Sequence, residues 1–145
     1  MLISEAFLLC LALVESGNRD IPGDYVKEVP LAQGPLQIHV ITVEEANDII
    51  YLQNKELGRS FYTYEDRHDY WMARSIAFVV LEHWKPIMEK RYKMRWTEAD
   101  ALALWRWGPD QWTPKSKENK VDKQRYRDYC KYIDRKKVTP ITKGE

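Results

Sequence analysis

The sequence predicts a mainly helical fold with a small β region between the first two helices. Apolar residues recur at helical spacing along several segments, and most of these begin at a capping residue or end at Gly or Pro. Residues 17–41 are instead rich in Pro and Gly and close on the β-branched stretch 38–41. The 145 residues are enough for one well-buried core, so we predict a single domain over residues 1–145.

The first helix is expected over residues 4–16, with Ser4 as its N-cap. The unbroken apolar run from Phe7 to Val14 predicts burial on every side. Gly17 and Asn18 follow, and both residue types readily adopt the left-handed conformation that ends a helix.

The long connection over residues 17–41 is expected to be functional, because connections of this length are unusual inside a small domain. After it, the capping-box pattern at 42–45 predicts a second helix running to about Leu52. The later helices are expected at 66–84, halted by Pro86, then at 87–94, 97–107 and 117–136.

The charge of the chain limits which classes of macromolecule are expected to bind it. The chain has 23 basic and 22 acidic residues, which argues against nucleic acid as a partner of the whole chain. Residues 115–137 carry ten Lys or Arg and four Asp or Glu, a net charge of +6. This indicates either a solvated helix face or a surface for an anionic polymer such as a cell wall or nucleic acid. We expect a monomer.

No segment reaches the length of a membrane span. The run 7–14 lacks the preceding basic residues of a signal peptide, so it is interpreted as part of the fold. Cys10 and Cys130 either form one long-range disulfide or are buried thiols.

Glu15 stands where the apolar helix ends. A carboxylate there is partly desolvated and near the negative end of the helix dipole, and both effects raise its pKa. A carboxylic acid that keeps its proton near neutral pH suits protonation of a leaving glycosidic oxygen. The alternative is a Glu that only solvates the helix end.

Three ordered motifs extend this interpretation: Glu15-Ser16-Gly17, then Gly34-Pro35-Leu36-Gln37-Ile38 nineteen residues after Glu15, then the helix 101–107 followed by Gly-Pro. Together they resemble the lysozyme-like superfamily of peptidoglycan-cleaving enzymes, which includes goose-type and invertebrate-type lysozymes and soluble lytic transglycosylases. The resemblance covers residues 7–133 and implies an α+β lysozyme-like fold.

The resemblance implies that Glu15 is the general acid and that Ser16 lies beside the sugar cleft. Gly34 would permit close backbone approach, and the Gln37 amide would bond sugar hydroxyls or an acetamido group. The alternative for Gln37 is an ordinary strand residue. His39 would touch substrate or be structural.

The third motif would bring Trp105 near the acid, where it desolvates Glu15 or stacks on a sugar; plain core packing is the alternative. Arg106 departs from the family pattern, which has Asn there. We expect it to bind a substrate carboxylate or to pair with a catalytic acid.

A glycosidase of the hydrolytic kind needs a second carboxylate. Glu28, six residues before Gly34, is the first choice and Asp24 the second, with Asp20 also in the loop; a solvated surface charge is the alternative for each. A lytic transglycosylase would use Glu15 alone, with help from the substrate acetamido group.

The sequence thus predicts a muramidase that hydrolyses β-1,4 MurNAc–GlcNAc bonds of a peptidoglycan strand, without cofactor or metal, since His39, His68 and His83 form no ligand cluster. It would act on the cell wall, as a phage lysin or as a domain of a longer protein. Left open are a transglycosylase, a chitin or chitosan glycosidase, and a non-catalytic lysozyme-like binding module.

Overall fold

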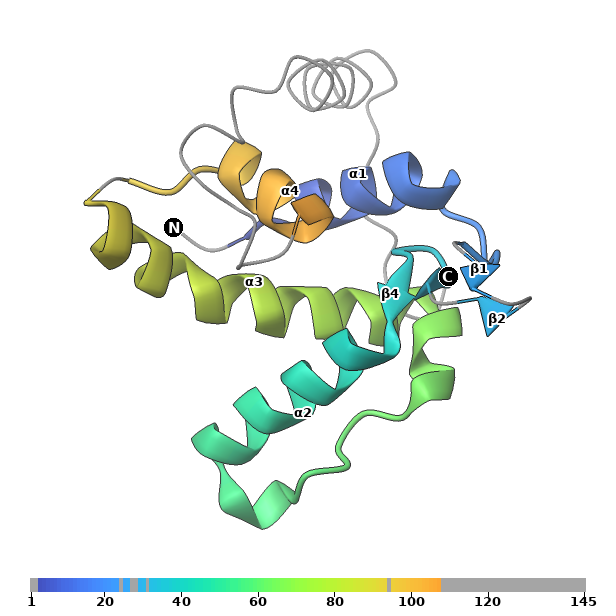
Figure 1. Ribbon diagram of the computed structural model, residues 1–145, viewed down its shortest axis with the longest axis horizontal. Coiled ribbons are helices and arrows are strands. Elements are labelled where there is room, and N and C mark those ends of the chain that lie inside the picture. The colour runs from blue at the N-terminus through green and yellow to red at the C-terminus, as the bar shows by residue number, and fades with distance from the viewer. Residues whose placement is uncertain (1–2, 24, 27–28, 31, 94, 108–145) are drawn as a thin grey trace. The chain divides into compact units, whose positions relative to one another are not determined.

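The computed structural model describes residues 3–107 except 24, 27–28, 31 and 94. This part of the chain is mainly helical, as predicted (Figure 1). Its α-helices are α1 (Glu5–Ser16), α2 (Val40–Gln53), α3 (Tyr70–Tyr92) and α4 (Glu98–Trp107). The predicted helix at 117–136, with Cys130, lies outside the described residues.

The chain divides into two compact units. The first contains residues 3–10 and, of the described part, residues 81–107; the second contains residues 11–80. Each takes one half of α1 and one half of α3. The single domain over residues 1–145 stays a prediction.

Helix α1 has the predicted ends. The Ser4 hydroxyl oxygen accepts a hydrogen bond from the Phe7 backbone N–H at 3.0 Å, which confirms Ser4 as the N-cap. Residues 7–12 are buried, although Leu13 and Val14 are only half-buried. At the other end, the helix is followed by two residues with positive φ, Gly17 at 70° and Asn18 at 56°, as predicted.

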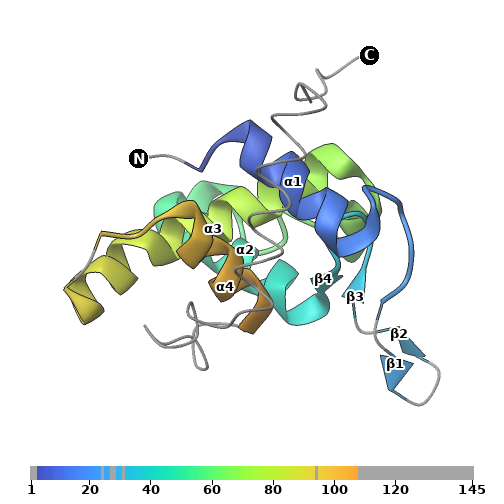
Figure 2. The ribbon, with the colours of Figure 1, turned by 90° about the horizontal axis from the view of Figure 1, so that it is seen from above.

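The predicted β region consists of two short antiparallel pairs, and both belong to the second unit. Strand β1 (Tyr25–Val26) pairs with β2 (Val29–Pro30), and β3 (Ala32–Gln33) pairs with β4 (Ile38–His39). Figure 2 shows the two pairs following one another in the loop between α1 and α2. The turn 34–37 that joins β3 to β4 contains two positive φ angles, 84° at Gly34 and 51° at Gln37.

Helix α2 begins two residues earlier than predicted. Strand β4 leads directly into Val40, and His39 is an N-cap whose side chain makes no capping bond. The capping box predicted at 42–45 is wrong, because those residues lie inside the helix. The helix ends at Gln53, one residue beyond the predicted Leu52.

Two short 3-10 helices, η1 (Lys55–Leu57) and η2 (Tyr64–His68), follow α2, and Figure 1 shows this part of the chain returning from the far end of α2 to the start of α3. Asp66 belongs to η2, where its carboxylate accepts a bond from the Thr63 N–H at 2.8 Å. Helix α3 begins at Tyr70 and not at the predicted Asp66, because Asp69 caps it by accepting a hydrogen bond from the Met72 N–H at 3.0 Å.

Helix α3 does not stop before Pro86, as the sequence predicted, but continues through it to Tyr92. Leu81 before the proline and Met88 after it are both completely buried. Burial of apolar side chains on both sides of Pro86 stabilises the continuous helix. This offsets the loss of the backbone hydrogen bond that proline cannot donate. Lys85 and Glu89 also bridge the same turn, with 2.8 Å between Nζ and Oε1.

Helix α4 has the predicted N-terminus. The Thr97 N–H donates to the Asp100 carboxylate at 2.8 Å, and the Thr97 hydroxyl bonds the same oxygen at 3.0 Å.

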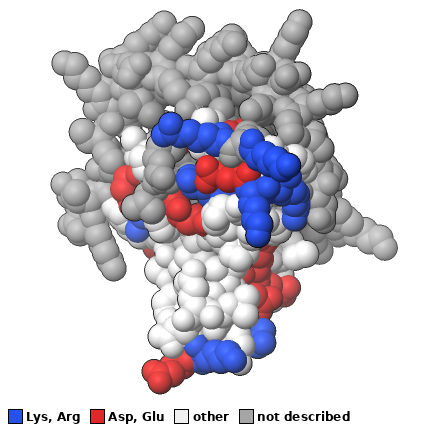
Figure 3. Space-filling model, turned by 90° about the vertical axis from the view of Figure 1, so that its left-hand side faces the viewer, with Lys and Arg blue, Asp and Glu red and all other residues white. Residues whose placement is uncertain are grey.

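The end of α3, which precedes α4 in the chain, is basic. Figure 3 shows Lys and Arg side chains gathered around acidic ones on the face of the molecule at that end, where the exposed cations are Lys90, Arg91, Lys93 and Arg95.

Candidate functional site

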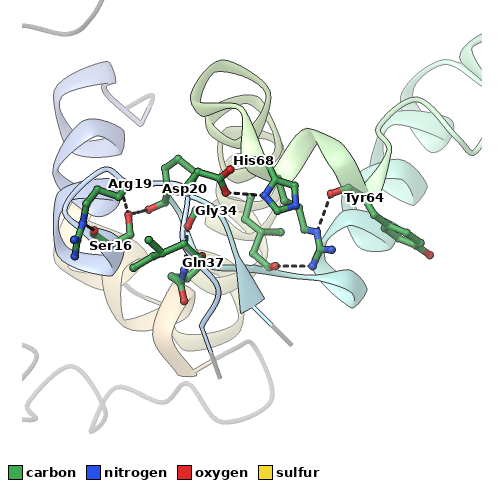
Figure 4. A network of polar contacts seen from close by, with 11 residues as sticks. Ser16, Arg19, Asp20, Gly34, Gln37, Tyr64 and His68 are labelled. Carbon is green, nitrogen blue, oxygen red and sulfur yellow. Dashed lines mark hydrogen bonds and ion pairs between the residues drawn. The ribbon is translucent and has the colours of Figure 1, made fainter. Parts of the chain in front are cut away.

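The end of α1 and the turn 34–38 meet inside the second unit (Figure 4). The buried Ser16 hydroxyl donates to the Pro35 carbonyl oxygen at 2.7 Å, although the two residues are 19 positions apart. Arg19 adds two bonds at the same place, from its backbone N–H to the Ser16 hydroxyl oxygen and from its Nε to the Ser16 carbonyl, each at 2.9 Å. The first two sequence motifs therefore lie side by side.

Gln37 ties the turn to the loop that leaves α1. Its Nε2 donates to the Ile21 carbonyl at 2.9 Å and to the Gly34 carbonyl at 3.0 Å. Its Oε1 lies so close to Gly23 that a Cβ there would be only 1.9 Å away. Both amide hydrogens thus have protein partners, and the predicted contact of Gln37 with a sugar stays a prediction.

The close backbone approach predicted at Gly34 is present. A Cβ at this residue would lie 1.7 Å from the carbonyl oxygen of Arg67 in η2. Arg67 is itself buried, and its guanidinium donates to the Tyr64 carbonyl at 2.9 Å and to the Ile38 carbonyl at 3.3 Å. The turn is therefore held between the end of α1 on one side and η2 on the other.

Asp20 and His68 form a hydrogen bond next to this turn, with 2.6 Å between Oδ1 and Nδ1. Their side chains are 51% and 34% exposed, so the pair is accessible to solvent (Figure 4). Asp20 is the third loop acid that the sequence suggests, but His68 was not expected here. The two residues are 48 positions apart and share no local motif, so sequence reasoning had no signal for the pair.

The other predicted site residues are distributed as follows. Glu15 is half-buried in the last turn of α1, next to Ser16. His39 is half-buried at the end of β4, directly before α2. Asp24 and Glu28 lie outside the described residues. The raised pKa of Glu15 and the second carboxylate stay predictions.

Trp105 and Arg106 belong to α4 and hence to the first unit, whereas Glu15 belongs to the second. Trp105 is half-buried. The predicted contact between this tryptophan and the acid, and the role of the arginine, therefore stay predictions.

Comparison of the chain with protein-family models, with curated proteins and with solved structures finds no match. None of the helices in the described part of the chain has the length and apolar character needed to cross a membrane. Within the same residues, no three potential metal ligands come together.

Proposed function

We propose that this chain is a peptidoglycan-cleaving glycosidase that hydrolyses β-1,4 MurNAc–GlcNAc bonds, with Glu15 as general acid. One observation carries the proposal: the hydrogen bond from Ser16 to Pro35, which fixes the turn 34–38 beside the helix end that bears Glu15. The ordered motifs that suggest the lysozyme-like superfamily are thereby supported by a contact as well as by their sequence spacing.

Glu15 would enter the reaction protonated. Its proton passes to the glycosidic oxygen while the bond from the anomeric carbon to that oxygen breaks, and positive charge develops on the sugar ring. In hydrolysis, a water oxygen then bonds the anomeric carbon and its proton goes to a carboxylate base. The rigid connection of Ser16 to the turn would hold the acid in one position relative to the sugar, which favours proton transfer.

The proposal is tested by the clearing of purified cell walls. The substitution Glu15→Gln keeps the shape of the side chain but removes the acidic proton that would be donated to the leaving oxygen. We therefore expect the rate of clearing to fall by at least about 100-fold. Glu5→Gln is the matched control, because it removes a carboxylate from the exposed first turn of the same helix. If the Glu15 variant clears walls as fast as the unmodified protein, the proposal is wrong.

Mass spectrometry of the products separates hydrolysis from transglycosylation. A reducing end requires water as the acceptor, whereas an anhydro-sugar shows that the substrate closed on itself. The variants Glu28→Gln, Asp24→Asn and Asp20→Asn, measured in parallel, identify the second carboxylate of a hydrolase. Unchanged rates in all three would favour the mechanism in which Glu15 acts alone.

A further inference from the structure

A separate cleft of about 540 Å³ lies in the second unit, between α2 and the segment 59–64. Its lining residues are Glu44, Asn47, Asp48, Arg59, Ser60, Tyr62, Thr63 and Tyr64. None of them is among the site residues predicted from the sequence. The volume is within the range of small-molecule sites, roughly 300–1,000 Å³.

The two walls of this cleft are fixed to each other. The buried Asn47 side chain accepts a bond from the Tyr62 backbone N–H at 2.7 Å and donates to the Tyr62 carbonyl at 3.0 Å. The Tyr62 hydroxyl is also bonded to the Ser75 hydroxyl, at 2.5 Å, on α3. Because both walls are held by buried hydrogen bonds, the cleft is formed before any ligand arrives.

The charges inside the cleft are already paired. The Arg59 guanidinium bonds the Asp48 carboxylate at 3.1 Å, and it stacks 4.0 Å from the centroid of the Tyr51 ring. The Tyr64 hydroxyl donates to Glu44 at 2.8 Å, and this bond raises the pKa of Tyr64. An ionic ligand would have to break these pairs, whereas a neutral polar ligand can use their remaining oxygens and N–H groups.

An exposed aromatic ring stands beside these polar groups. Tyr64 lines the cleft and is 47% exposed. A sugar ring offers C–H groups that pack on an aromatic face, together with hydroxyls that bond carboxylate and guanidinium groups at its edge. The cleft offers both kinds of contact.

From this combination we infer that the cleft between α2 and residues 59–64 binds a neutral saccharide. The inference rests on the proposed function only for the choice of sugar, since a glycan strand would be the substrate. A strand held here by one of its neutral N-acetylglucosamine rings would be anchored away from the bond that is cleaved. Such uniform binding lowers KM without accelerating the chemical step.

The test uses the full chain carrying Glu15→Gln, so that no probe is cleaved. It is titrated with chitotetraose, the β-1,4 tetramer of N-acetylglucosamine, while backbone amide shifts are followed by NMR. We expect shifts at the lining residues and a Kd about tenfold weaker in Tyr64→Ala, which removes the stacking surface. Leu52→Ala is the control, because Leu52 is 72% exposed on the same helix but does not line the cleft.

Two further variants guard against a folding defect in Tyr64→Ala. Tyr64→Phe keeps the ring and should bind within a few-fold of the parent, and Arg59→Gln removes a donor and should weaken binding without altering the Asn47–Tyr62 contacts. Absence of shifts at the lining residues, or equal Kd in the parent, Tyr64→Ala and Arg59→Gln, would overturn the inference. Binding at the cleft by a protein that never clears cell walls would instead refute the proposed glycosidase and leave the saccharide site standing.

Discussion

A methyl group at Gly34 has no room, because the carbonyl oxygen of Arg67 would lie 1.7 Å from it. The backbone φ of 84° adds strain for any side chain. We therefore expect Gly34→Ala to lower the free energy of unfolding by at least about 3 kcal/mol. Urea unfolding followed by circular dichroism measures the change.

Gly58 supplies the control for this substitution. It has a similar φ, 71°, but nothing lies within 4 Å of the position that its Cβ would take. Its ψ of -176° makes this a backbone conformation that is essentially restricted to glycine, so Gly58→Ala should cost that strain alone, about 1–3 kcal/mol. Equal losses at the two glycines would show that the approach of Arg67 to the turn is not tight.

The lowered pKa of Glu89 predicts how the stability of the fold changes as the pH falls. Its pKa lies below the ordinary value of 4.5 because of the hydrogen bond from Lys85, with a smaller contribution from the Trp96 N–H. The stability from this carboxylate is therefore complete above about pH 4.5 and is lost as the pH falls through the lowered pKa. Glu89→Gln should cost about 1 kcal/mol at pH 7 and progressively less as the pH falls below about 4.5.

For Glu98 we expect the opposite dependence of stability on pH, so this residue serves as the comparison. Burial raises its pKa, and a hydrogen bond with Ser4 only partly offsets this. The folded state then favours the protonated carboxyl, so Glu98→Gln should stabilise the protein at pH 7 and have no such effect at low pH. Thermal unfolding from pH 3 to pH 7 measures both variants. A gain of stability at pH 7 in Glu89→Gln would contradict the lowered pKa of Glu89, and a loss in Glu98→Gln would contradict the raised pKa of Glu98.

Individual residues were predictable where their local chemistry decides the outcome. Gly17 and Asn18 end α1 because their residue types tolerate positive φ, and this was visible in the sequence. Gln37 also has a positive φ, 51°, but its side-chain bonds to Ile21 and Gly34 depend on the folded loop. The Asp20–His68 pair was not predictable for the same reason.

At the scale of elements, α3 contains an interior proline that most helices exclude. Proline at position 86 leaves the carbonyl four residues earlier without its helical bond, so Pro86→Ala should raise the free energy of unfolding by about 1–2 kcal/mol. Lys90→Ala, at another exposed position of α3, should change it by less than about 0.5 kcal/mol. A loss of stability in Pro86→Ala would mean that the proline is needed to shape the helix.

The existence of the helices was easier to predict than their first residues. Periodicity locates an apolar face, and that face persists through Pro86 because Met88 is buried beyond it. The start of α2 was misplaced because β4 runs into it directly. The start of α3 was misplaced because Asp66 belongs to η2 and it is Asp69 that caps α3. In both cases a neighbouring element, invisible to a local pattern, decided the boundary.

At the scale of the whole molecule, the sequence predicted the mainly helical class and the small β region, since both follow from composition along the chain. Two of the three motifs that the sequence suggested are in contact through the hydrogen bond from Ser16 to Pro35. The third motif lies in the other unit, and the comparisons supply no relative to extend the argument. The cleft beside α2 escaped sequence reasoning because its walls come from residues that form no recognisable motif.

The division into two units has a consequence for how the protein is made. The second unit is one uninterrupted stretch, residues 11–80, and its contacts can close as soon as that stretch has left the ribosome. The first unit is assembled from two segments of the described chain that are far apart in sequence, residues 3–10 and 81–107. The hydrogen bond from the Ile3 N–H to the Glu82 carboxylate, for example, joins residues 79 positions apart. During synthesis, the apolar side chains in the amino-terminal half of α1 therefore stay uncovered until residues 81–107, which are translated much later, have also left the ribosome.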